Sequence, residues 1–161
     1  MSKQKSKTNA IRELEQANLS HTVHEVSADG SMTGLEIAKL AGENPDCVFK
    51  TLVTVGKTNE HYVFMIPVAC ELDLKKAAQA AGEKSIHMIK SRELLDLTGY
   101  VHGGCSPVGM KKEFRTFIDE TALLYPKIYF SAGRIGMQIE MKVEDLERIV
   151  PLTFCDLILI A

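Results

Sequence analysis

The 161-residue sequence has no excess of positive charge, since 19 Lys and Arg residues are set against 21 Asp and Glu residues for a formal net charge of −2. A protein that coats nucleic acid needs a strong positive field, so this class is excluded, although a local basic patch remains compatible with the sequence. Hydrophobic residues make up 45% of the chain and charged residues 25%. These values and the length predict a single globular domain.

Cysteine pairs at metal-binding or redox spacing are also lacking. The four cysteines are Cys47, Cys70, Cys105 and Cys155, and no two of them form a Cys-x-x-Cys pair. None has a histidine at the spacing of a metal site, so we expect neither a metal nor a cofactor. Free thiols are typical of proteins in a reducing compartment.

Long apolar runs are missing as well. The basic segment 1–7 is not followed by the apolar stretch of a signal peptide, and no run reaches membrane-spanning length. We therefore expect a cytoplasmic protein with a basic flexible tail over residues 1–8 and a single domain over residues 9–161. The lysines of the tail either contact phosphates or are simply solvated.

Short helices and strands alternate along the chain. Helical spacing of apolar residues and capping signals predict helices at 9–18, 34–41, 74–81, 91–97 and 143–150. Residues typical of strands predict strands at 21–26, 47–55, 62–68, 86–89, 114–119, 127–131 and 137–141, with a turn at 132–136 and an apolar run of uncertain type at 152–160. The pattern predicts an α+β fold with a mixed, largely antiparallel and curled sheet, surrounded by helices.

Local signals refine this prediction. Thr33 and Glu36 fit a capping box, and Asp73 and Ser91 are candidate helix caps. The strand at 62–68 has almost no polar alternation, so it should be central, and it should pair with the preceding strand as a hairpin.

A glycine-rich loop, Gly99–Lys112 (GYVHGGCSPVGMKK), stands out because it holds four glycines and one proline. Glycine allows a close backbone approach to a ligand or a positive φ angle. Such a loop can present main-chain N–H groups to an oxyanion or a phosphate. The alternative is a tight connection between two strands.

Lys50 lies within an apolar strand and shares a face with Val48 and Leu52. A lysine on an inner face is costly unless its ammonium has a partner or a role, whereas on a solvated face it needs neither. Cys105 could act as a nucleophile only with a base, and His102, three residues away on a loop, guarantees no such geometry. No Ser-His-Asp arrangement is visible, so the sequence offers a lysine and a donor loop without an obvious nucleophile.

Three segments resemble the YbaK/EbsC proteins, bacterial relatives of the editing domain of some prolyl-tRNA synthetases. They are Val48–Val53 (VFKTLV), Leu72–Ala77 (LDLKKA) and the glycine-rich loop. The resemblance extends from the helix at Asn9 to the strand at Met137. It implies a mixed sheet closing toward a barrel with helices outside, and a freestanding Cys-tRNA(Pro) deacylase that needs no metal.

The resemblance also implies a site. Its catalytic residues would be Lys50 and Gly103. Its substrate-binding residues would be Gly104, Cys105, Ser106 and Pro107 of the loop, Ser131 and Gly133 of the late glycine turn, and Val26 and Gln138. The last two stand where the family pattern has a tyrosine and an aspartate, which leaves the exact specificity open.

The implied mechanism is substrate-assisted. A synthetase pocket discriminates against a slightly smaller amino acid by only ~1–3 kcal/mol, so the wrong product is removed afterwards. The cysteine thiol would attack its own ester carbonyl while Lys50 binds the terminal phosphate or developing charge and the backbone at Gly103 donates to an oxygen. The partners would be mischarged tRNA(Pro) and prolyl-tRNA synthetase, because a chain with this net charge should bind tRNA weakly by itself.

Two alternatives remain open from the sequence. The chain could remove alanine or another small residue from tRNA, or it could bind aminoacyl-tRNA without catalysis. Lys111 and Lys112 either meet tRNA phosphates or are solvated.

Overall fold

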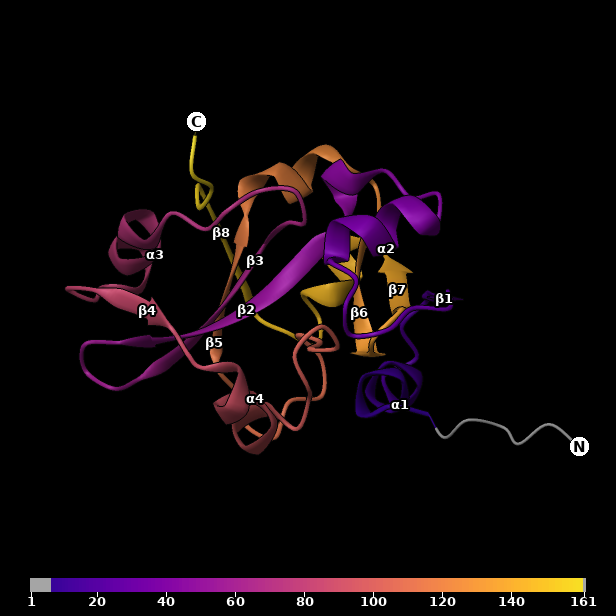
Figure 1. Cartoon of the computed structure of the whole chain (residues 1–161), viewed down its shortest axis with the longest axis horizontal. Coiled ribbons are helices and arrows are strands. Elements are labelled where there is room, and N and C mark those ends of the chain that lie inside the picture. The colour runs from indigo at the N-terminus through magenta and orange to yellow at the C-terminus, as the bar shows by residue number, and fades with distance from the viewer. Residues whose placement is uncertain (1–6, 161) are drawn as a thin grey trace, which may run out of the picture.

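The computed structural model describes residues 7–160 as an α+β fold with five α-helices and eight strands (Figure 1). The helices are α1 (Asn9–Gln16), α2 (Gly34–Leu40), α3 (Leu74–Ala81), α4 (Ser91–Thr98) and α5 (Val143–Leu146), with 3-10 turns η1 (Pro45–Cys47) and η2 (Glu120–Leu124). The strands are β1 (Thr22–Glu25), β2 (Phe49–Gly56), β3 (His61–Pro67), β4 (Ile86–Met88), β5 (Arg115–Asp119), β6 (Ile128–Arg134), β7 (Met137–Met141) and β8 (Leu152–Cys155). Among these residues no helix is both long and apolar enough to cross a membrane.

The strands form two sheets. The five-stranded sheet has the order β4-β2-β3-β5-β8, with antiparallel pairs around β2 and parallel pairs from β3 through β5 to β8. The predicted hairpin is confirmed, since β2 pairs with β3 from Phe49 opposite Pro67 to Val55 opposite His61. The predicted central strand is β3, in which every residue after His61 is buried.

The second sheet has the order β1-β7-β6 and is antiparallel throughout. A single parallel bridge between Val48 and Tyr129 links it to the start of β2. Within the described residues neither sheet is closed or strongly curled, so the expected curling toward a barrel is wrong. One bridge cannot carry a continuous hydrogen-bonded ladder from one sheet into the next, and closure requires such a ladder.

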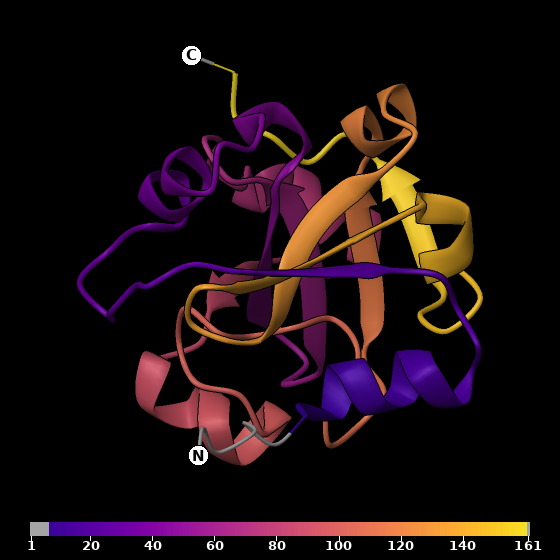
Figure 2. The same cartoon turned by 90° about the vertical axis from the view of Figure 1, so that its right-hand side faces the viewer.

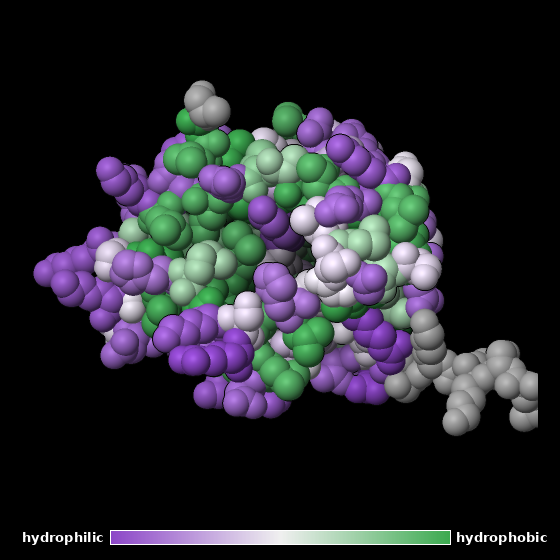
Figure 3. All heavy atoms as spheres, viewed as in Figure 1, coloured by the Kyte–Doolittle hydropathy of each residue, from purple (hydrophilic) through white to green (hydrophobic). Residues whose placement is uncertain are grey.

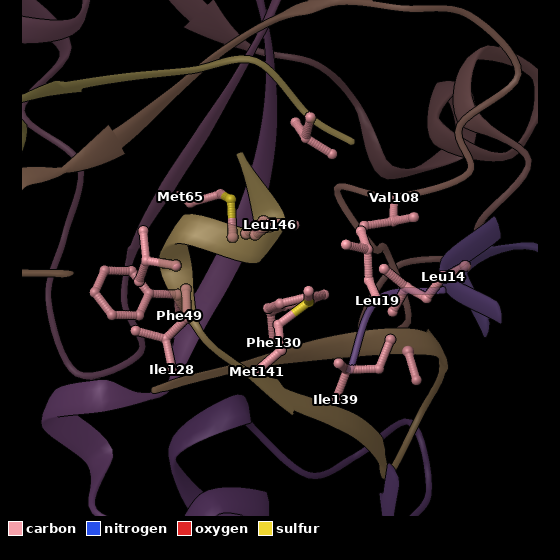
Figure 4. Close-up of a cluster of buried hydrophobic side chains, with 14 of the residues drawn as sticks. Leu14, Leu19, Phe49, Met65, Val108, Ile128, Phe130, Ile139, Met141 and Leu146 are labelled. Atoms are coloured by element: carbon pink, nitrogen blue, oxygen red, sulfur yellow. The ribbon is translucent and has the colours of Figure 1, made fainter. Parts of the chain in front are cut away.

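The main core fills the space between the two sheets. Figure 4 shows Phe49 and Met65 of the larger sheet pointing toward Ile128 and Phe130 of β6. Each of these side chains is at most 2% exposed, and full burial of one such group stabilises the fold by about 1.5–3 kcal/mol. A second cluster joins alanines of α3 to Phe64, Ile66 and Phe117 of the larger sheet. Helix α3 lies at the end of the molecule away from sheet β1-β7-β6 (Figure 1), which faces the viewer in Figure 2.

Local capping signals set most helix ends. The capping box of α2 is confirmed, because Thr33 Oγ1 accepts from the Glu36 N–H at 3.1 Å and the Glu36 carboxylate accepts from the Thr33 N–H at 3.2 Å. Asp73 likewise caps α3, accepting from the N–H groups of Lys75 and Lys76. The predicted cap Ser91 is wrong, since it is the first residue of α4 and the cap position is Lys90.

Other boundaries also shift. The helix predicted at 143–150 is helical only to Leu146 and continues as turns. The apolar run of uncertain type begins with β8 at the edge of the larger sheet. Most of the predicted tail, residues 1–6, lies outside the described residues, whereas Thr8 caps α1 and its hydroxyl donates to the Ala132 carbonyl.

Candidate active site

A cavity of about 660 Å³ opens along the edge of β2. Its walls come from β2, the segment that leads into α2, the start of α4, the glycine-rich loop and the β6–β7 turn. Figure 3 shows that this face is hollowed near its centre, between the regions of α2 and β2 in Figure 1. The volume lies within the range of sites that bind small molecules.

The edge of β2 is open because its neighbour β4 is short. β4 pairs only with Thr54, Val55 and Gly56, and the Ile89 N–H extends this contact to the Val53 carbonyl at 3.3 Å. Strand residues point their backbone groups alternately to either side, so the N–H and C=O of Thr51 face the same edge. There the strand leaves hydrogen-bonding groups available to a ligand.

The side chain of Thr51 adds to this edge. Thr51 lines the cavity, and its Oγ1 is buried without a hydrogen-bond partner in the described part of the chain. A buried hydroxyl without a partner is unfavourable, so this position carries a cost to the stability of the fold.

The glycine-rich loop forms the opposite wall and is fixed by two contacts. Gly104 lies so close to the β6–β7 turn that a Cβ atom on it would be 3.2 Å from the Arg134 Cα. The Tyr100 hydroxyl donates to the Val108 carbonyl at 2.6 Å. Gly103 has a φ of +85°, which a residue with a side chain rarely adopts, so glycine is needed here.

Not every N–H of this loop is available to a ligand. The Gly104 N–H donates to the Val101 carbonyl at 3.0 Å and closes a turn. Within residues 7–160 the N–H groups of Gly103 and Cys105 have no acceptor. These two groups, both in residues that line the cavity, are therefore the donors that the loop can offer.

Lys50 lies in the same cavity lining as Gly103 and Cys105. It is partly buried, and burial lowers its pKa, while the nearby Cys70 and Glu71 act in the opposite direction. Its ammonium makes no hydrogen bond or ion pair with any described residue. A partly desolvated cation without a partner is suited to bind an anion.

The charged residues of the cavity lining are Lys50 and Arg134, and the lining residues include no aspartate or glutamate. The lining therefore has a positive character although the whole chain is slightly negative. Such a cavity favours a ligand that carries phosphate or develops negative charge.

The thiol of Cys105 is not placed for nucleophilic attack. Cys105 is 6% exposed and packs with Val53, Val63 and Leu94 in a hydrophobic cluster. Burial raises the pKa of this thiol to about 12, and the smaller effect of a hydrogen bond with Thr98 acts in the opposite direction. A thiol in this state is protonated at neutral pH and therefore unreactive.

A base that could activate another nucleophile is also not seen. In the described part of the chain, no histidine hydrogen-bonds to a hydroxyl or thiol of the cavity wall; His102 lies exposed at its rim. The same residues contain no group of three His, Cys, Asp or Glu side chains that could hold a metal ion. The chemistry that the geometry offers is charge stabilisation and positioning of a ligand.

The structure brings half of the predicted site residues together. Those that line the cavity are Lys50, Gly103, Cys105, Ser131 and Gln138. Those outside its lining are Gly104, Ser106, Pro107, Gly133 and Val26.

The predicted residues outside the lining have structural contacts instead. Ser106 is fully buried and accepts from the Val108 N–H at 3.3 Å. Pro107 lines a second cavity of about 480 Å³ behind the loop. Gly133, with a φ of +109°, approaches Tyr100, and the Val26 N–H donates to the Gly136 carbonyl at 2.9 Å, which attaches the end of β1 to the β6–β7 turn.

Sequence reasoning missed Thr51, Arg134 and Glu43. Thr51 adjoins Lys50 in the VFKT segment, so its place in that motif was an available signal. Arg134 was expected only as a turn residue, and it lies instead at the end of β6. Glu43 follows α2 and meets Gln138 only through the tertiary fold, so no local spacing could have indicated it.

Comparison with known proteins shows the family to which the chain belongs. A family model described as the aminoacyl-tRNA editing domain matches residues 29–149, which include the whole cavity lining. A crystal structure described as "a putative trans-editing enzyme for prolyl tRNA synthetase" is 26% identical, with a TM-score of 0.83 over 96% of this chain and 99% of that one. The chain belongs to the aminoacyl-tRNA editing domain family, of the YbaK/EbsC type.

Among individual relatives, the chain is similar to "Putative Cys-tRNA(Pro)/Cys-tRNA(Cys) deacylase EbsC" of Enterococcus faecalis. The two are 43% identical over 143 residues, which cover 88% of this chain and 87% of the relative. A more distant relative is the uncharacterized protein YwhH of Bacillus subtilis, 23% identical over 116 residues that cover 72% of this chain and 73% of YwhH. The family expected from the three sequence segments is thus confirmed.

Proposed function

We propose that this protein is a trans-editing deacylase that removes cysteine from mischarged tRNA(Pro) in the cavity beside β2. The observation that carries the proposal is that one cavity is lined by Lys50, Gly103 and Cys105. Among the described residues the Lys50 ammonium has no partner, and the N–H groups of Gly103 and Cys105 have no acceptor. The membership of the editing-domain family and the similarity to EbsC support the same reaction class.

In this proposal Lys50 binds the terminal phosphate of the tRNA or the charge that develops on the ester. The N–H groups of Gly103 and Cys105 donate to the carbonyl oxygen as it becomes an oxyanion. Because the cavity lining has no carboxylate, the anionic 3′ end meets no like charge there.

The attacking group in this proposal is the thiol of the misattached cysteine. A C–S bond forms at the ester carbonyl, the C–O bond to the ribose breaks, and the thiol proton ends on the ribose oxygen, which releases the tRNA and a cyclic thioester. Holding the thiol near its own carbonyl supplies much of the acceleration, so the enzyme itself needs no nucleophile. The buried, protonated state of Cys105 agrees with this division of roles.

We further propose that prolyl-tRNA synthetase supplies the choice of tRNA, in the cytoplasm where translation occurs. The net charge of −2 provides little general attraction for a polyanion, so a partner is needed to deliver the correct tRNA. A tight, tRNA(Pro)-selective complex with the isolated protein would contradict this part of the proposal.

The test is a deacylation assay with Cys-tRNA(Pro), Ala-tRNA(Pro) and Pro-tRNA(Pro). We expect rapid loss of cysteine alone, and loss of that activity in Lys50→Ala. Hydrolysis of alanine in preference to cysteine would favour the second candidate, a deacylase for small residues. Binding of Cys-tRNA(Pro) without hydrolysis would refute the deacylase and favour a non-catalytic module.

A further inference from the structure

Sheet β1-β7-β6 has one apolar face and one polar face. Ile139, Met141 and Phe130 point into the main core, while the residues between them point the other way. His24, Gln138 and Ser131 are direct partners across the three strands, so their side chains lie on one face. Ser131 and Gln138 of this row line the cavity.

Glu43 covers this polar face from the end of α2. The helix ends at Leu40, Gly42 follows with a φ of +72°, and the Glu43 N–H donates back to the Ala38 carbonyl at 2.9 Å. This closing bond fixes the backbone from which the Glu43 side chain extends. The residue is 9% exposed, which is unusual for a glutamate and indicates specific partners.

The partner of Glu43 is the amide of Gln138. The hydrogen-bond network assigns the amide nitrogen to the side that faces Glu43, where it donates to both carboxylate oxygens, Oε2 at 2.7 Å. A carboxylate only accepts, so it holds the amide in this one orientation. A protonated carboxyl both donates and accepts, and it therefore allows the amide to turn over.

From this arrangement we propose that Glu43 is a positioning residue that orients the Gln138 amide toward the ligand of the cavity. This proposal rests on the proposed function, because the ligand is taken to be the aminoacyl end of the tRNA. With Glu43 ionised, the amide nitrogen is held by the carboxylate and the amide oxygen is left to accept from a donor of the ligand, such as its ammonium group. With Glu43 protonated, that orientation is no longer enforced.

The surroundings of Glu43 place this change near neutral pH. Burial is the main cause that raises the pKa of Glu43, which lies at about 7. The nearby His24 lowers this pKa, the Glu140 carboxylate raises it, and the hydrogen bond with Gln138 lowers it. His24 Nε2 of β1 donates to the Glu140 carboxylate of β7 at 2.9 Å, and this bond lowers the pKa of Glu140. The other titratable groups that face Glu43 are Cys47 of η1 and Tyr129 of β6.

The activity test compares Glu43→Gln with the wild type across pH 6 to 8, using Cys-tRNA(Pro). At pH 8 the variant should lose roughly tenfold in kcat/KM, the effect of one hydrogen bond to a charged group. At pH 6 the two proteins should converge, because the wild-type carboxyl is then protonated too. Glu147→Gln, an exposed glutamate beyond α5, is the matched control and should equal the wild type at every pH.

A double-mutant cycle asks whether Glu43 acts through Gln138. In a Gln138→Leu background, Glu43→Gln should have no further effect on kcat/KM. The proposal would be overturned if Glu43→Gln lowered kcat/KM equally at all pH values, or if it lowered kcat/KM in the Gln138→Leu background as well. It would also be overturned if Glu43→Gln had wild-type kcat/KM at pH 8.

A second readout needs no activity. The side-chain amide signals of Gln138, identified by their loss in Gln138→Leu, should titrate by ¹⁵N NMR with a midpoint near pH 7. Glu43→Gln should abolish this titration, and His24→Asn should retain it with a raised midpoint. A titration that survives Glu43→Gln, or is missing in the wild type, refutes the role of Glu43. A wild type that deacylates no aminoacyl-tRNA refutes the proposed function instead, and the amide titration still decides the role of Glu43.

Discussion

Replacing Lys50 by methionine should strongly reduce activity while it stabilises the fold. Lys50 lies in β2 opposite Ile66 and on the same side of the strand as Leu52, so an apolar side chain of similar length suits the position. Its pKa is lowered, chiefly by burial, so the folded protein disfavours the protonated form. Removing that charge should stabilise the protein by up to about 1 kcal/mol, or ~2–4 °C in Tm for a chain of this size.

The pH dependence of this gain follows from the direction of the shift. Because the pKa is lower in the fold, the unfolded chain binds more protons between the two pKa values, and wild-type stability rises with pH in that window. The advantage of Lys50→Met should be constant at neutral pH and disappear above the ordinary pKa of lysine. The catalytic loss should be about 10²–10³-fold, as for removal of one charge-stabilising group from an active site.

Denaturant unfolding and the Cys-tRNA(Pro) assay measure the two effects on the same samples. Lys75→Met, an exposed lysine of α3 outside the cavity lining, is the control and should change neither. Lys50→Met with a lower Tm would mean that the ammonium holds the fold together. Lys50→Met with wild-type activity would refute the place of Lys50 in the site.

Three further substitutions test the glycine-rich loop. Gly104→Ala should destabilise the protein by about 1–3 kcal/mol and reduce activity, because the new Cβ meets the backbone of the β6–β7 turn. Gly30→Ala, with 3.9 Å to the nearest side chain, should leave stability unchanged, and equal melting curves for the two variants would contradict the close approach. Cys105→Ala should keep most of the activity, since its thiol is buried and protonated, and near-total loss in a folded variant would restore the case for an enzyme nucleophile. Tyr100→Phe should cost about 1–3 kcal/mol because it leaves the Val108 carbonyl unpaired, and unchanged denaturant unfolding would refute the anchoring role of this bond.

The local elements could be predicted from the sequence where local chemistry determines them. The Thr33–Glu36 capping box and the hairpin around Gly56 depend on residues a few positions apart, and both are present. Ser91 is not the cap because the helix already begins at Ser91, and the cap position before it, Lys90, makes no side-chain hydrogen bond.

The sheet arrangement could not be predicted in the same way. The parallel pairs of β3, β5 and β8 join strands that are far apart in the sequence, and their order is decided by which faces bury the core. Short connections favoured antiparallel neighbours, so the sequence pattern indicated one curled sheet where the structure has two.

In the candidate site, too, residues within sequence motifs could be predicted and tertiary contacts could not. Lys50 and Gly103 were found through motifs, and the structure places both in one cavity. The open edge of β2 at Thr51 depends on the length of β4, and the contact of Glu43 with Gln138 depends on where α2 ends, so both came from the fold.

The most direct measurement compares kcat for Cys-tRNA(Pro) with kcat for Ser-tRNA(Pro), which exchanges one sulfur atom for oxygen. If the substrate supplies the attacking thiol, the cysteinyl ester should be cleaved rapidly and the seryl ester no faster than in buffer. Comparable kcat values for the two esters would show that the attacking group comes from elsewhere and would contradict the mechanism.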